Sequence, residues 1–70
     1  MSTLQPHQQR VINEKREIDE RIEKLNVFFN TETFRNLSRQ EVFLLIEQED
    51  AMSQYSGILT RRIELFKEQA

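Results

Sequence analysis

The sequence predicts an all-α protein: an antiparallel helical hairpin of two long helices with a short helical turn between them, assembling as a homo-oligomeric bundle. The 70-residue chain contains one glycine and one proline, so little interrupts regular helix. Apolar residues recur in two long segments with the three-and-four spacing of amphipathic helices. Without cysteines, a domain this small depends on regular helix packing or self-association. We expect a single domain over residues 1–70.

The first helix is predicted over about residues 5–29. Pro6 suits its first turn, because the missing N–H of proline would have no partner within the helix. Leu4, Val11, Ile18 and Leu25 recur every seven residues, with Ile22 and Phe29 on the adjoining position, which is the seam of an amphipathic helix. The i,i+4 spacing of Glu17 with Arg21, and of Glu20 with Lys24, predicts charged pairs on a solvent-facing side.

A connection over residues 30–37, with its own short turn, leads to a second helix over about residues 38–68. Ser38 and Glu41 match a capping box, in which the serine side chain accepts a hydrogen bond from the glutamate N–H. Leu37 and Val42 have the spacing of the accompanying hydrophobic staple. Gly57 is the one interruption in the helix and costs about 1 kcal/mol relative to alanine.

The second helix carries two stripes of residues. The first stripe is Val42, Leu45, Glu49, Met52, Ser56, Leu59, Ile63 and Phe66, and the second stripe is Leu44, Gln48, Ala51, Tyr55, Ile58, Arg62 and Leu65. Together they span more than about 160° of the helix, which is wider than one neighbouring helix covers. The short connection makes the first helix one antiparallel neighbour, and another copy of the chain is the simplest second one. The predicted oligomer interface contains Leu44, Ala51, Met52, Gly57, Ile58 and Leu65.

Small residues replace leucine in the middle of this helix, and two interpretations of them stay open. Either a neighbouring backbone approaches closely at Ser56 and Gly57, or the missing volume leaves a pocket. In a pocket, the ring of Tyr55 would stack on a planar ligand, and Arg61 or Arg62 would bind phosphate. The predicted ligand-binding residues are Tyr55, Ser56, Arg61 and Arg62.

Other functional classes find little support in the sequence. A net charge of −2 argues against DNA binding, which depends on an excess of lysine and arginine. His7 has no partner at metal-ligand spacing, Glu47 and Asp50 lack a third ligand, and no catalytic set is present, so we expect no metal, no cofactor and no enzymatic activity. No apolar run reaches the length of about 18 residues that a membrane crossing needs. We expect a cytoplasmic protein.

The segment FRNLSRQEVFLLIEQEDAMSQYSGILTRRI resembles a family of small helical-hairpin proteins from crAss-like and other tailed bacteriophages. The matching positions are Phe34, Leu37, Gln48, Met52, Tyr55, Ile58, Leu59, Arg62 and Ile63. The resemblance implies a phage accessory protein in the host cytoplasm. It suggests an oligomer that counters host immunity by sequestering a small anionic nucleotide signal between subunits, which gives Tyr55, Arg61 and Arg62 a role.

Two alternatives to sequestration also stay open. The second stripe is equally suited to a module that binds a host or phage protein. It is also suited to a hairpin whose only role is self-assembly.

Overall fold

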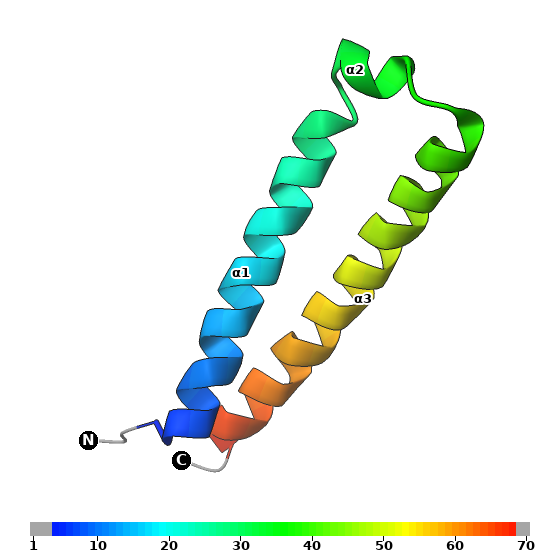
Figure 1. The fold of residues 1–70 in the computed structure, drawn as a ribbon. Coiled ribbons are helices and arrows are strands. Elements are labelled where there is room, and N and C mark those ends of the chain that lie inside the picture. The colour runs from blue at the N-terminus through cyan, green and yellow to red at the C-terminus, as the bar shows by residue number, and fades with distance from the viewer. Residues whose placement is uncertain (1–3, 69–70) are drawn as a thin grey trace.

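The computed structural model describes residues 4–68, which form three helices. These are α1 (Pro6–Phe28), α2 (Glu32–Arg35) and α3 (Arg39–Glu68). The two long helices α1 and α3 run antiparallel and pack against each other, and α2 bridges them at one end (Figure 1). The structure confirms the predicted all-helical hairpin. Within the described residues, neither α1 nor α3 is long and apolar enough to cross a membrane.

Side chains cap the starts of the helices. At α1, the backbone N–H of Gln5 donates to Oε1 of Gln8 at 2.9 Å. At α2, Oγ1 of Thr31 accepts from the N–H of Phe34 at 3.2 Å. At α3, Oγ of Ser38 accepts from the N–H of Glu41 at 3.2 Å, as the capping-box pattern predicts. Each bond satisfies a donor that the first turn of a helix leaves without an internal partner.

The first stripe of α3 forms the seam with α1. Leu59 and Ser56 are buried in it, and the other members of the stripe are half-buried. The α1 side of the seam largely follows the same three-and-four spacing. The buried or half-buried positions of α1 are Gln8, Val11, Ile12, Lys15, Ile18, Ile22, Leu25 and Phe28, and Phe29 just after the helix is also half-buried. This repeat keeps the contacting faces of two long helices together over their length.

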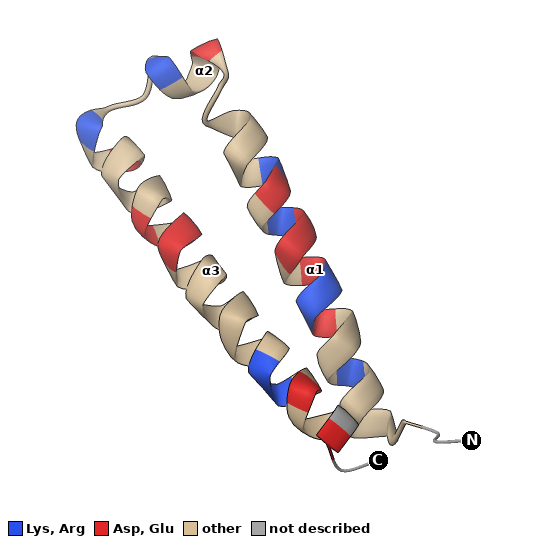
Figure 2. Ribbon diagram, turned by 180° about the vertical axis from the view of Figure 1, so that it is seen from behind, with Lys and Arg blue, Asp and Glu red and all other residues tan. Residues whose placement is uncertain are grey.

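The seam is not equally tight along its length. In both ribbon views α1 and α3 lie close together near the termini and diverge toward α2 (Figures 1 and 2). Among the described residues the buried side chains are Val11, Ser56 and Leu59, and all lie on the side of the termini. We call residues 4–16 with 53–68 the terminal half and residues 17–52 the bend half.

An aromatic cluster fills the wide end of the bend half. The ring of Phe34 in α2 packs edge-on against that of Phe28, with centroids 6.0 Å apart. It also packs against the ring of Phe29 at 5.0 Å in a tilted arrangement. The short helix α2 therefore acts as a spacer that covers the end of the seam with apolar rings.

Candidate functional site

The second stripe of α3 is exposed along its whole length. Leu44, Ile58 and Leu65 are 62%, 46% and 53% exposed, although each is a large apolar side chain. Phe43 and Ile46, nearer the bend, are also exposed. Because large apolar patches on a protein surface mark interaction sites, the second stripe is a candidate contact surface.

Tyr55, in the middle of the second stripe, is held by a contact with α1. Its hydroxyl donates a hydrogen bond to the carboxylate of Glu14. This bond raises the pKa of Tyr55 above its ordinary value of 10.0, and the nearby charge of Arg62 opposes the rise more weakly. The Tyr55 ring therefore lies at the border between the seam and the exposed stripe, with Arg62 close by.

Ser56 belongs to a polar contact inside the seam. Its hydroxyl donates to Oδ1 of Asp19 at 2.5 Å and accepts from Nζ of Lys15 at 2.9 Å. Lys15 and Asp19 also form a salt bridge at 2.9 Å. Both the hydroxyl of Ser56 and the charge of Lys15 lower the pKa of Asp19, and the hydroxyl has the larger effect. The hydroxyl of Ser56 is thus engaged between the two helices.

The predicted ligand-binding residues occupy three sides of α3. Tyr55 and Arg62 share the second stripe, and Ser56 faces α1. Arg61 is exposed four residues after Gly57, so these two residues share a further face. A Cβ added at Gly57 would meet nothing within 4 Å, so no backbone of this hairpin approaches it closely.

The predicted interface residues also separate into groups. Four of them, Leu44, Ala51, Ile58 and Leu65, lie together on the exposed second stripe. Met52 is half-buried in the seam with α1. Gly57 lies on the face of α3 that it shares with Arg61. The exposed stripe therefore keeps most of the predicted interface on one continuous surface.

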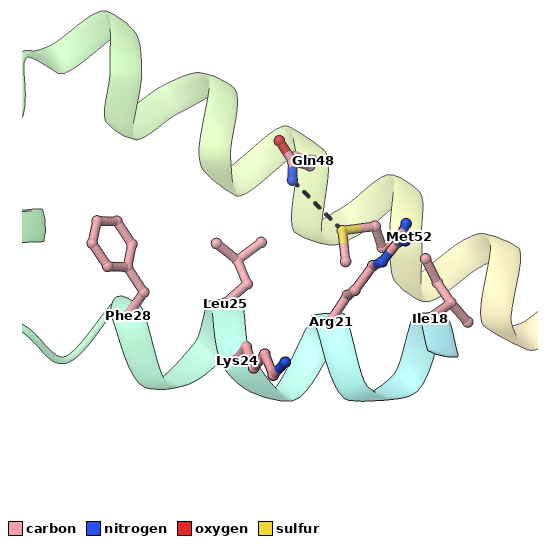
Figure 3. A pocket seen from close by; sticks show the side chains of 7 residues that line it. All are labelled: Ile18, Arg21, Lys24, Leu25, Phe28, Gln48 and Met52. Atoms are coloured by element: carbon pink, nitrogen blue, oxygen red, sulfur yellow. Dashed lines mark hydrogen bonds between the residues drawn. The ribbon is translucent and has the colours of Figure 1, made fainter. Parts of the chain in front are cut away.

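A groove of about 530 Å³ opens between the two long helices in the bend half. It is lined by Ile18, Arg21, Lys24, Leu25, Phe28, Gln48 and Met52, and we call it the bend groove. Figure 3 shows the side chains of Leu25 and Phe28 pointing toward α3 and Arg21 reaching toward it. On the α3 side of the groove, the amide of Gln48 donates a weak hydrogen bond to the sulfur of Met52 at 3.8 Å.

The cations of the bend groove are free of the pairs that the sequence predicted for them. Among the side chains that the structure describes, the one salt bridge joins Lys15 and Asp19, so the expected pairs of Arg21 with Glu17 and of Lys24 with Glu20 do not form. Exposed pairs of this kind contribute only a few tenths of a kcal/mol, so side-chain entropy readily outweighs them. Both cationic groups remain available to an anion.

The bend groove combines two kinds of surface that small anionic ligands use. Its lining combines the apolar side chains of Ile18, Leu25, Phe28 and Met52 with the polar or charged side chains of Arg21, Lys24 and Gln48. A ligand with a flat apolar part and a phosphate would match both. Within the described residues, no group of three or more His, Cys, Asp or Glu side chains is placed to hold a metal ion.

The bend groove is not among the sites that the residue pattern predicted. Arg21 lies three residues after Ile18 and four before Leu25, which places it at the edge of the seam rather than on the opposite side. That spacing was the signal available in the sequence. It did not reveal that the helices diverge beside Arg21 and leave room for a ligand.

No curated protein and no solved structure matches the chain. Residues 5–65 match the family described as Sequestin. The matched region covers most of the chain and contains the bend groove and the whole second stripe. The chain therefore belongs to the Sequestin family.

Proposed function

We propose that this protein is a non-enzymatic phage accessory protein that sequesters a small nucleotide-derived signal and so counters host immunity. The observation that carries the proposal is the bend groove, in which Arg21 and Lys24 line the same space as apolar side chains. The family name describes sequestration, which fits a protein that binds a molecule without transforming it.

The chemistry of a nucleotide fits the two surfaces of the groove. A planar base buries its faces against Phe28 and Met52, and the phosphates lie at Arg21 and Lys24. A guanidinium forms paired hydrogen bonds with phosphate oxygens, whereas an ammonium acts as a point charge. Arg21 is therefore the main phosphate ligand of this proposal, and Lys24 supports it.

The ligand residues predicted from the sequence enter the proposal unequally. Gln48 belongs both to the second stripe and to the lining of the groove, so Tyr55 and Arg62 lie on a surface continuous with the site. The hydroxyl of Ser56 is engaged with Asp19 and Lys15, and Arg61 lies on a different face of α3. We therefore keep Tyr55 and Arg62 as ligand-binding residues contributed at a contact between copies.

Calorimetric titration of the intact protein tests the proposal, with ADP-ribose, cyclic ADP-ribose and cyclic di-AMP as probes. We expect at least one probe to bind, and Arg21→Ala to weaken that binding about tenfold to a hundredfold, the effect of losing a charge-assisted hydrogen bond. Arg16→Ala is the matched control, because Arg16 is an exposed arginine of α1 outside the groove. Absence of binding by every probe, or equal binding by the two variants, would contradict the proposal.

The exposed second stripe favours one other function, docking on a host or phage protein. In that case the calorimetric titrations are silent and affinity capture from infected cells recovers a specific protein. Loss of capture on Ile58→Glu, which places a charge in the middle of the stripe, would identify the docking surface. A hairpin whose stripe serves self-assembly alone would give neither a ligand nor a partner.

A further inference from the structure

The second stripe has an internal symmetry. Its order is Leu44, Gln48, Ala51, Tyr55, Ile58, Arg62 and Leu65. Read from either end toward Tyr55 in the centre, the stripe has the same order of residue types: apolar, polar, apolar. A two-fold contact between copies needs a surface that is complementary to itself in this way.

We propose that a second copy of this chain packs antiparallel on the second stripe, with the two-fold axis at Tyr55, so that Arg62 of the partner subunit reaches Gln48 and completes the bend groove. In this register Leu44 packs against Leu65 of the partner subunit. The small Ala51 packs against the larger Ile58 of the partner subunit. Pairing small with large residues lets the two helices interlock.

Charge selects the antiparallel arrangement over the parallel one. In a parallel pair, Arg62 would face Arg62 of the partner subunit, and two like charges in contact destabilise an interface. In the antiparallel pair, the guanidinium faces the amide oxygen of Gln48, which accepts hydrogen bonds. Residues 51–60 include no Asp, Glu, Lys or Arg, so α3 itself brings no charge to the middle of the contact (Figure 2).

The same register explains how an acidic protein builds an anion site. The chain has a net charge of −2, yet Arg21 and Lys24 already line the bend groove. Gln48 belongs to both the second stripe and the bend groove. Arg62 of the partner subunit, which contacts Gln48 in this register, therefore adds a third cation at the open side of the groove. Only this last step rests on the proposed function, because the packing of the two copies requires no ligand.

Disulfide cross-linking tests the register directly, since the natural chain contains no cysteine. We expect a mixture of Leu44→Cys and Leu65→Cys proteins to form a cross-linked heterodimer on mild oxidation, because these positions come within disulfide distance. Each variant alone should stay uncross-linked. Cross-linking of either variant with itself, as a parallel pair requires, or no cross-link in the mixture, would overturn the proposal.

Charge substitutions at Gln48 test the same contact without oxidation. In ligand-free sedimentation, Gln48→Glu should tighten the dimer about fivefold to thirtyfold, because two symmetry-related ion pairs with Arg62 form. Gln48→Lys should loosen the dimer by a similar factor. In a parallel pair both substitutions would place like charges opposite each other, so loosening by both would refute the antiparallel register. A monomeric natural chain would refute the contact itself.

The completion of the groove has a separate test. Arg62→Ala should weaken binding of the nucleotide probe about tenfold and leave the sedimenting mass that of a dimer. Arg61→Ala is the matched control, because Arg61 is the neighbouring arginine on another face of α3. Equal probe binding by the two variants overturns the shared site. If the Leu44→Cys and Leu65→Cys proteins cross-link as expected but no nucleotide probe binds, the antiparallel dimer is supported and the proposed ligand is rejected.

Discussion

The terminal half and the bend half of the hairpin share one residue spacing and differ in how closely their helices pack. In the terminal half, Val11 and Leu59 are buried, and the small Ser56 contacts Lys15 and, at the boundary with the bend half, Asp19. In the bend half the seam residues are only half-buried, and a groove separates the helices. The comparison indicates that one half supplies most of the stability and the other half supplies the space for a ligand.

The largest expected effect comes from matched leucine truncations in the two halves. Leu59→Ala should lower the free energy of unfolding by about 3 kcal/mol, because it removes a fully buried side chain and leaves a cavity. Leu45→Ala, at a half-buried position of the same stripe, should cost about 1 kcal/mol. Urea denaturation measures both, and Leu59→Met is the volume-conserving control. Equal losses at the two leucines would contradict the division of the hairpin into a tight and an open half.

Ser56→Ala sharpens the comparison at the polar contact of the terminal half. It should cost about 1 kcal/mol of unfolding free energy at neutral pH, the usual loss for one buried hydrogen bond. The pKa of Asp19 is lowered in the folded state from 3.8, so the stabilisation linked to it is present above that pH and is lost as the pH falls through the folded pKa.

The hydrogen bond from the hydroxyl of Ser56 lowers the pKa of Asp19 more than the hydrogen bond from Lys15 does. Removing this hydroxyl should therefore flatten the decline of unfolding free energy below about pH 4. Urea denaturation across a pH series checks this. An unchanged pH profile in Ser56→Ala would show that the contact does not form in solution. Asp19→Asn is the control that removes the titrating group itself.

Gly57→Ala should have an effect of similar size and opposite sign, because it should be stabilising. A helix-interior alanine is favoured over glycine by about 1 kcal/mol, and the added Cβ meets nothing within 4 Å. Thermal unfolding measures the gain, and sedimentation measures the association of the variant. A loss of association would show that another copy approaches this face closely, which is the tight crossing that the small residues of α3 also allow.

The smallest expected effect is spectroscopic. Tyr55 is the only tyrosine, so its ionisation is visible in the ultraviolet absorbance of the whole protein. Its pKa is raised by Glu14, so the stabilisation from this bond is present below pH 10.0 and is lost as the pH rises through the folded pKa. Glu14→Gln should move the titration midpoint down. If the titration midpoint of Tyr55 is the same in Glu14→Gln, the hydroxyl of Tyr55 does not contact Glu14 of α1 in solution.

Residue spacing was enough to predict the hairpin. The first stripe, from Val42 to Phe66, faces α1 as its three-and-four repeat indicates, even though it contains Glu49 and Ser56. The role of Lys15 could not be predicted in the same way. Its partner Ser56 lies 41 positions away, and only the folded register brings the two together.

The candidate site was less accessible from the sequence. Spacing tells which side of a helix faces its neighbour, but the separation of two helices depends on the volumes packed between them, including the ring of Phe34 in α2. The bend groove arises from that separation. The exposed second stripe, by contrast, followed from the sequence because one neighbouring helix covers only part of α3.

The position of the tightest packing has a consequence for how the chain folds. Val11 and Leu59 lie near opposite ends of the sequence, so the chain must close a long loop before the best-buried layer forms. If folding began at the turn, the first contacts to form would bury little apolar surface and contribute little stability. We therefore expect this hairpin, with its higher contact order, to fold more slowly than hairpins that pack best beside their loop. Amide hydrogen exchange should accordingly be slowest toward the ends of the hairpin and faster beside α2, the reverse of ordinary fraying.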